Sequence, residues 1–180
     1  MRIIGGTYKG RTIRSPKGLP VRPTTDRTKE ALFNRLNHLV ELAGIKVLDL
    51  FAGTGNMTLE FWSRGARQVV SVDQHHRCVG TIKQHLRDLQ IRGGSVIRMD
   101  ARRYVSQATE SFDLIFMDPP YALPGQPELV EQILAGELLT PDGILIVEHS
   151  PQLNFEEIEG FEESRIYGSS ALSTFYAREE

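Results

Sequence analysis

From Ile45 onward, short apolar runs alternate with stretches in which apolar residues recur at helical spacing. The apolar runs predict strands at residues 46–51, 68–73, 95–99, 112–117 and 143–148. The intervening patterns predict helices at residues 56–64, 75–91, 101–108 and 127–134. Strands that alternate with helices imply right-handed crossovers and a parallel sheet. The body of the chain is therefore predicted to be an α/β domain.

The amino-terminal segment departs from this alternation. Residues 2–6 and 8–15 predict a small hairpin or extended arm. A helix is then expected to about Leu42, with Thr25 or Asp26 as its cap. Its apolar face should pack on the body, and three basic side chains should stay in water: Arg27, Lys29 and Arg35.

The carboxyl-terminal tail departs from it as well. Two extended runs, at residues 161–167 and 172–178, are separated only by Gly168-Ser-Ser-Ala, which predicts a hairpin that adds antiparallel pairing to the sheet edge. The plausible boundary lies near Gly44. We therefore expect two units, a basic hairpin and helix at 1–44 and an α/β body at 45–180.

The composition narrows the class of protein. Hydrophobic residues make up 40% of the chain and charged residues 24%, values typical of a soluble globular protein. The single cysteine, Cys78, excludes an internal disulfide, and the histidines lack metal-ligand spacing. No apolar run approaches the roughly 18 residues needed to span a bilayer. We expect a cytoplasmic monomer with no metal and no membrane partner.

The formal net charge of −2 hides a strong asymmetry. Residues 1–35 hold nine basic and two acidic side chains, a net +7, whereas the remainder carries −9. A basic segment on an acidic body favours a polyanion bound at one end, with nucleic acid preferred over a merely solvated surface.

One strand runs into a glycine turn. In Val47-Leu-Asp-Leu-Phe-Ala-Gly-Thr-Gly55, the glycines allow backbone to approach a bound molecule closely. Asp73 ends the next strand, 18 residues beyond Gly55, where a carboxylate can accept both ribose hydroxyls of a nucleotide-like ligand. Thr58 stands where a dinucleotide motif has its third glycine. A nucleoside without phosphates is therefore favoured.

Two further acids end strands. Asp49 favours a cationic ligand such as S-adenosylmethionine, although it could also be a turn acid bonded to local amides. Asp100 could accept a hydrogen bond from an adenine amine between the apolar walls of Met99 and Ala101, or simply cap a helix. Three acids at three successive strand ends point to a ligand more strongly than any one of them.

The run Phe112–Met117 stops abruptly at Asp118-Pro-Pro-Tyr121. Two prolines cannot continue a sheet ladder, so the chain must turn there. This leaves Asp118 and Tyr121 at the carboxyl end of a strand, where open α/β sheets place their ligands. Taken alone, the tetrapeptide could equally be an ordinary polar turn.

Together these motifs resemble class I S-adenosylmethionine-dependent methyltransferases, and DPPY resembles those that methylate exocyclic amines of nucleobases. Met1-Arg-Ile-Ile-Gly-Gly, Arg22-Pro-Thr-Thr-Asp-Arg and Glu30-Ala-Leu-Phe-Asn resemble, more narrowly, the RsmD-type 16S ribosomal RNA (guanine-N2)-methyltransferases. The resemblance implies a Rossmann-like, mostly parallel seven-stranded sheet with a C-terminal antiparallel hairpin. It also makes residues 45–180 the S-adenosylmethionine-binding catalytic domain.

The implied activity is methyl transfer from S-adenosylmethionine to the N2 amine of a guanine in 16S rRNA (the guanine-966 type of activity), with S-adenosylhomocysteine as product. Asp118, the Pro119 carbonyl and Tyr121 would orient and stack the base. The expected cofactor-binding residues are Asp49, Phe51, Gly53, Thr54, Gly55, Asp73, Asp100, Ala101 and Asp118. The expected RNA-binding residues are Arg11, Arg14, Arg22, Arg27 and Tyr121.

The expected partner is 16S rRNA within a partly or fully assembled small ribosomal subunit, because so short an arm offers few contacts with which to select one guanine unaided. Two alternatives stay open. A DNA or RNA adenine-N6 or cytosine-N4 amino-methyltransferase shares the DPPY motif, although 180 residues leave no room for a separate DNA-recognition domain. A non-catalytic nucleotide-binding or RNA-binding module is disfavoured by the coincidence of the strand-end acids.

Overall fold

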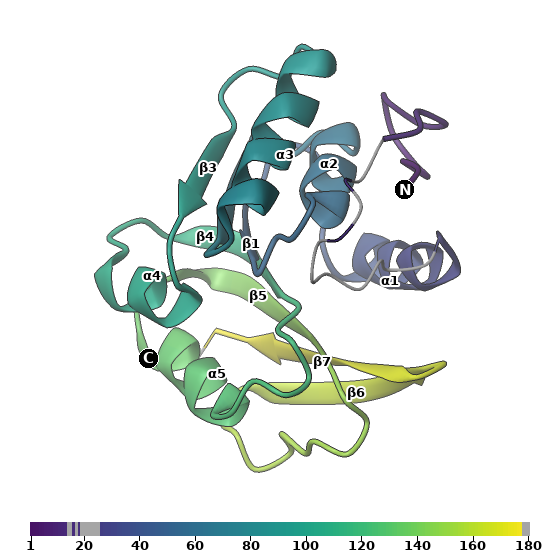
Figure 1. Ribbon diagram of the computed structural model, residues 1–180. Helices are drawn as coiled ribbons and strands as arrows, with labels where there is room; N and C mark the ends of the chain where they lie inside the picture. The colour runs from purple at the N-terminus through teal and green to yellow at the C-terminus, as the bar shows by residue number, and fades with distance from the viewer. Residues whose placement is uncertain (14–15, 17, 19–25, 178–180) are drawn as a thin grey trace.

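A mixed sheet forms the centre of the computed structural model, which describes residues 1–13, 16, 18 and 26–177 (Figure 1). The strands are β1 (Lys46–Leu50), β2 (Gln68–Asp73), β3 (Ser95–Arg98), β4 (Phe112–Met117), β5 (Leu139–His149), β6 (Phe161–Tyr167) and β7 (Ser170–Tyr176). The helices are α1 (Asp26–Leu39), α2 (Asn56–Ser63), α3 (His76–Asp88), α4 (Ala101–Gln107) and α5 (Gln126–Ala135).

The strand order is β3-β2-β1-β4-β5-β7-β6. The first five strands in this order pair in parallel, and β7 pairs antiparallel with both β5 and β6. This is the predicted Rossmann-like class I methyltransferase fold with its C-terminal hairpin. Because β7 runs against β5, the turn between β6 and β7 lies at the edge where the parallel strands end.

Alternation along the strands separates two apolar layers. Leu48 and Leu50 of β1 belong to the core beneath α4 and α5, whereas Val47 belongs to the core beneath α1 and α2. Such alternation with both faces covered is what a buried parallel sheet requires. The helices thus lie on both faces of the sheet (Figure 1).

The elements appear in the predicted order, with shifted boundaries. Helix α1 ends at Leu39 rather than near Leu42, and α3 ends at Asp88 rather than Ile91. Strand β5 begins at Leu139, because Leu139 pairs with Phe112 before a register shift that the sequence pattern did not reveal.

The predicted amino-terminal hairpin is reduced to an arm with a single bridge, between Arg2 and Thr12. Backbone bonds from Ile3 N to Arg11 O (3.0 Å) and from Ile13 N to Met1 O (2.9 Å) hold its two sides together. Ile3 and Ile13 are buried and share a core with residues of α2 and α3. The arm therefore packs on the body as well as on itself.

Candidate active site

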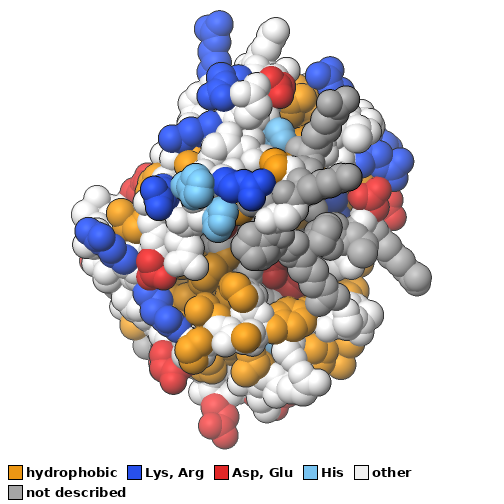
Figure 2. Space-filling view, in the orientation of Figure 1, with side chains coloured by type: hydrophobic (Ala, Val, Ile, Leu, Met, Phe, Trp, Pro, Cys, Tyr) orange, Lys and Arg blue, Asp and Glu red, His pale blue; other side chains and the backbone are white. Residues whose placement is uncertain are grey.

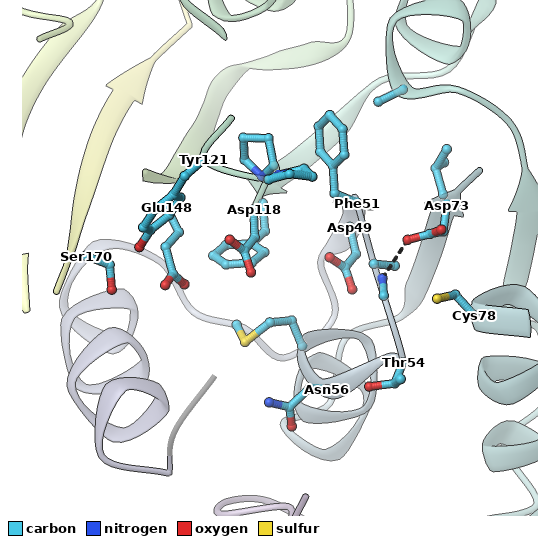
Figure 3. Close-up of a pocket in the computed structure, with 18 of the residues that line it drawn as sticks. Asp49, Phe51, Thr54, Asn56, Asp73, Cys78, Asp118, Tyr121, Glu148 and Ser170 are labelled. Carbon is cyan, nitrogen blue, oxygen red and sulfur yellow. Dashed lines mark hydrogen bonds between the residues drawn. The ribbon is translucent and has the colours of Figure 1, made fainter. Parts of the chain in front are cut away.

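A cavity of about 1470 Å³ opens where the parallel strands end (Figure 3). Five acids line it from neighbouring strands, in the order Asp100 after β3, Asp73 of β2, Asp49 of β1, Asp118 after β4 and Glu148 of β5. We call the part lined by Asp49, Gly53, Asp73, Met99 and Asp100 the glycine-turn lobe. The part lined by Tyr121, Glu148, Tyr167, Gly168 and Ser170 is the hairpin lobe. Asp118 lies between the two lobes in Figure 3.

The glycine turn after β1 has a backbone that only a few residue types adopt readily. Phe51, Gly53 and Gly55 have φ angles of 61°, 55° and 83°. A side chain at Gly55 would also be crowded, because its Cβ would lie 2.9 Å from Cγ1 of Ile82. Gly55 is therefore required for packing against α3, and it is not among the residues that line the cavity. Gly53 does line the cavity, as predicted, and exposes backbone to it.

Asp73 holds this turn in place. One of its carboxylate oxygens accepts a hydrogen bond from Gly53 N at 2.9 Å, shown in Figure 3, and the other accepts from His75 N at 2.7 Å. Each carboxylate oxygen can accept more than one hydrogen bond. The predicted contact with ribose hydroxyls is thus compatible with this structural role.

Asp49 is fully buried behind the turn. Thr58 Oγ1 donates to its carboxylate at 2.5 Å and lies 2.9 Å from Ser71 Oγ. Burial raises the pKa of Asp49 to about 7, against the opposing hydrogen bonds from Thr58 and with a smaller contribution from the charge of Asp73. Thr58, noted in the sequence only as a missing glycine, therefore supports this acid.

Asp100 serves as the N-cap of α4, because its side chain accepts from Arg103 N at 3.1 Å. It also lines the cavity beside Met99 and Ala101. Both uses considered for this residue from the sequence are therefore possible together.

The segment Asp118–Tyr121 follows β4 directly, as predicted. The amide of Asp118 donates to Leu50 O at 3.4 Å, Pro119 is buried, and Tyr121 is 37% exposed at the cavity. Gln126 fixes this loop: its buried amide donates to the carbonyls of Pro120, Tyr121 and Leu123 at 3.2, 3.4 and 3.2 Å. No pattern in the sequence marks Gln126, because its hydrogen-bond partners are backbone atoms.

Apart from Tyr121, the residues of the hairpin lobe were not predicted. Glu148 is 7% exposed and points toward the cavity beside Tyr121 and Asp118 (Figure 3). The turn between β6 and β7 supplies Tyr167, Gly168 and Ser170 to the same wall. One signal was present in the sequence: Glu148 follows the apolar run Ile144–Val147 much as Asp118 follows Leu114–Met117.

The amino-terminal arm corrects the prediction for Lys29, which is buried instead of solvated. Its Nζ donates to Arg2 O at 2.6 Å, Asn56 Oδ1 at 3.0 Å and Glu60 Oε2 at 3.1 Å. The apolar spacing along α1 predicted that Lys29 faces solvent. The amino-terminal arm instead covers this side of the helix, and the Arg2 carbonyl accepts a hydrogen bond from Lys29. Lys29 thus joins the arm to the helix that follows the glycine turn.

Of the predicted RNA-binding residues, Arg11 is exposed on the arm, whereas Arg14 and Arg22 and the side chain of Arg27 lie outside the described part of the chain.

A second basic group lies near the mouth of the cavity. It consists of the exposed residues His76, Arg77, Arg98, Arg102 and Arg103, with half-buried His75. His75 lines the cavity and stacks on His76, with ring centroids 5.2 Å apart. Figure 2 shows arginine, lysine and histidine side chains bordering a hydrophobic hollow on this face. We call these six residues the basic rim.

Other chemistry is limited in the described residues. They contain no group of three acidic, histidine or cysteine side chains able to hold a metal ion, and no helix among them is both long and apolar enough to cross a membrane. Cys78 is buried, and burial raises the pKa of its thiol to about 11, as suits a structural thiol.

Comparison with known proteins places the chain in a family. Residues 1–176 match the model for the family described as conserved hypothetical protein 95. "Putative rRNA methyltransferase YlbH" of Bacillus subtilis is 32% identical over 99% of this chain and 100% of its own length. Ribosomal RNA small subunit methyltransferase D of Escherichia coli is 33% identical over 67% of this chain and 60% of its own length.

The same result comes from solved structures. A structure named "Putative methyltransferase yhhF from Escherichia coli" superposes with a TM-score of 0.86 and 25% identity, covering 100% of this chain and 99% of the other. The sequence resemblance and the fold therefore agree. The chain belongs to the conserved hypothetical protein 95 family, the family of RsmD-type methyltransferases.

Proposed function

We propose that this protein transfers a methyl group from S-adenosylmethionine to the exocyclic N2 amine of a guanine in 16S ribosomal RNA. The observation that carries the proposal is the position of Asp118 between the glycine-turn lobe and the hairpin lobe of one cavity of about 1470 Å³ (Figure 3). The names of the relatives, rRNA methyltransferase and ribosomal RNA small subunit methyltransferase D, support the substrate class.

The glycine-turn lobe fits S-adenosylmethionine. Gly53 leaves backbone open to the ligand, Asp73 faces the position of a ribose, and Met99 and Ala101 offer apolar walls beside Asp100 for an adenine. Phe51 and Thr54 complete the lining, and buried Asp49 offers a carboxylate to the cationic end. When bound, this donor supplies an electrophilic methyl group on a sulfonium. No phosphate-binding group is needed here.

Asp118, Pro119 and Tyr121 would present the target amine. The Asp118 carboxylate and the Pro119 carbonyl can each accept an N–H of the N2 amine, which turns the nitrogen lone pair toward the donor lobe. Tyr121, partly exposed at the cavity, can stack on a base that has left its own stack. Gln126 keeps the three groups in register through its bonds to the loop carbonyls.

RNA phosphates would bind at two places around the cavity. Arg11 lies on the arm, in the basic segment that also contains Arg14, Arg22 and Arg27. The basic rim supplies a second group of cations near the mouth. Phosphate contacts of this kind fix the position of an RNA without reading its sequence. We therefore expect the protein to act on a partly or fully assembled small subunit, in which proteins help to present one guanine. We also expect it to be a cytoplasmic monomer.

The test is methylation by the purified protein of naked 16S rRNA and of small subunits from cells that lack the modification. After digestion, mass spectrometry should detect N2-methylguanosine, and the Asp118→Asn variant should produce far less. N6-methyladenosine or N4-methylcytidine as the product would overturn the choice of base. Absence of any methylated nucleoside on either substrate would overturn the proposed activity.

A further inference from the structure

The sheet register places a second carboxylate beside Asp118. Met117 of β4 pairs with Val147 of β5, so Asp118 and Glu148 occupy the next positions on adjacent parallel strands. Neighbouring strands lie about 4.8 Å apart in a sheet. The two acids are therefore side by side at the end of the sheet.

Both acids also face the same way. Leu114 and Phe116 of β4, and Ile144 and Ile146 of β5, all pack in the core beneath α1 and α2. Side chains two residues apart share a face, so Asp118 and Glu148 continue these two rows beyond the apolar core. Figure 3 shows both carboxylates directed into the cavity, with Tyr121 beside them.

The chemistry of this pair selects the kind of base edge that can enter. Ionised carboxylates accept hydrogen bonds and cannot donate them. Among the standard bases, guanine presents adjacent N1–H and N2–H donors on its Watson–Crick edge. Adenine and cytosine present an amine beside a ring nitrogen that carries a lone pair, and this lone pair would face a carboxylate.

We propose that Glu148 is the specificity-determining residue that accepts the N1–H of the target guanine while Asp118 holds its N2 amine, a role that rests on the proposed function. Because Glu148 is buried, it should discriminate strongly between guanine and the other amino bases. A base whose ring nitrogen carries a lone pair would leave that nitrogen and the carboxylate without a hydrogen bond, away from water. Glu148 thus separates guanine from adenine, which the Asp118–Tyr121 segment alone does not.

The test uses 16S rRNA with 2-aminopurine at the target position, in whichever substrate form the wild type methylates. This base keeps the N2 amine but carries a lone pair at N1 in place of the N1–H. Wild-type protein should prefer guanine. The Glu148→Gln variant can donate to the N1 lone pair, so its guanine-to-2-aminopurine ratio of kcat/KM should fall by on the order of 10- to 100-fold.

Binding gives a second readout that needs no methyl transfer. The fluorescence of 2-aminopurine changes when the base leaves the RNA stack, so titration without methyl donor measures entry into the cavity. Glu148→Gln should bind this RNA more tightly than wild type, whereas Glu137→Gln should not. Glu137 is exposed just before the opposite end of β5, so it controls for the loss of one negative charge.

Glu148→Asp provides a third variant that keeps the carboxylate. It should lose kcat/KM on guanine because its reach is shorter, and should still prefer guanine over 2-aminopurine. An unchanged base preference in Glu148→Gln, with folding and S-adenosylmethionine affinity intact, would overturn the role of Glu148 although the proposed function stands. If wild type forms no N2-methylguanosine, the proposed function itself fails.

Discussion

Nζ of Lys29 lies 3.1 Å from Oε2 of Glu60, and both side chains are almost completely buried. Glu60 also accepts hydrogen bonds from Ile4 N at 3.0 Å and Gly5 N at 2.9 Å, and from Arg64 Nε at 3.1 Å. One carboxylate in α2 therefore binds both the arm and α1. The ion pair fixes the basic segment against the helix that follows the glycine turn.

Breaking this pair should destabilise the protein strongly. Lys29→Met removes the fully buried one of the two cations that bind the Glu60 carboxylate and leaves only Arg64, so the loss should approach the about 3–5 kcal/mol that is typical of a broken buried ion pair. Urea denaturation should show this loss, and the exposed control Lys83→Met should change the free energy of unfolding by less than about 0.5 kcal/mol. A Lys29→Met variant as stable as Lys83→Met would mean that the arm does not depend on this pair.

Gly55→Ala should impair both stability and cofactor binding. Its φ of 83° disfavours alanine, and the added Cβ would come within 2.9 Å of Ile82. We expect a loss of at least about 1 kcal/mol and weaker S-adenosylmethionine binding by calorimetry. Gly80→Ala is the matched control: it lies within α3 with open space around it, so it should stabilise by up to about 1 kcal/mol. The change in the free energy of unfolding should therefore have opposite signs in the two variants, and equal signs would contradict the prediction.

Asp49 should make stability fall as the pH rises from about 4 to about 7. Its pKa is about 7 in the folded protein and 3.8 for an unperturbed aspartate side chain, so the folded state holds more protons than the unfolded state between these two pH values. Asp49→Asn stays neutral and lacks this contribution. Its stability relative to wild type should therefore increase across this window and stay constant above it. Denaturation at several pH values, with exposed Asp142→Asn as control, measures the difference. Parallel curves for wild type and Asp49→Asn would contradict the raised pKa.

Asp118→Asn should reduce kcat for methylation by on the order of 100- to 1000-fold, the usual effect of losing one group that stabilises a transition state. Its dissociation constant for S-adenosylmethionine should stay within about twofold of the wild-type value, because Asp118 lies at the edge of the glycine-turn lobe. Single-turnover kinetics and cofactor titration separate the two quantities. If kcat and the affinity for S-adenosylmethionine fall by equal factors, Asp118 binds the methyl donor and does not orient the amine.

Arg11→Gln should flatten the salt dependence of RNA binding by about one in the slope of log K against log salt concentration. Arg11 is exposed on the arm, on which the proposed RNA contact rests. Arg92→Gln removes an equally exposed charge in the loop before β3, at the edge opposite the cavity, and should leave the slope unchanged. Identical slopes for wild type and Arg11→Gln would place RNA elsewhere.

Sequence patterns predicted most of the fold because the apolar runs of a buried parallel sheet are nearly continuous. They also predicted Asp49, Asp73, Asp100 and Asp118 at the cavity, since an acid that ends an apolar run marks a strand end. The same rule applies to Glu148, which directly follows the apolar run Ile144–Val147.

Other features depend on partners distant in sequence. Lys29 and Glu60 are 31 residues apart, and nothing in the helical pattern of α1 shows that an arm covers its polar side. Gln126 binds carbonyl oxygens, which every residue has, so residue type gave no information. The basic rim gathers charges from α3, β3 and α4 that are dispersed along the chain.

The turn between β6 and β7 reaches the cavity from the two strands at one edge of the sheet. The glycine turn instead follows β1, which lies inside the sheet between β2 and β4. The strands beside β1 pair without any contribution from this hairpin. Under the proposed function, mutations at Gly168 or Ser169 should therefore change which base or RNA surface is accepted while the glycine-turn lobe keeps its shape. Members of such a family could therefore come to methylate different RNA targets through substitutions in the turn between β6 and β7, while selection keeps the residues that bind the methyl donor.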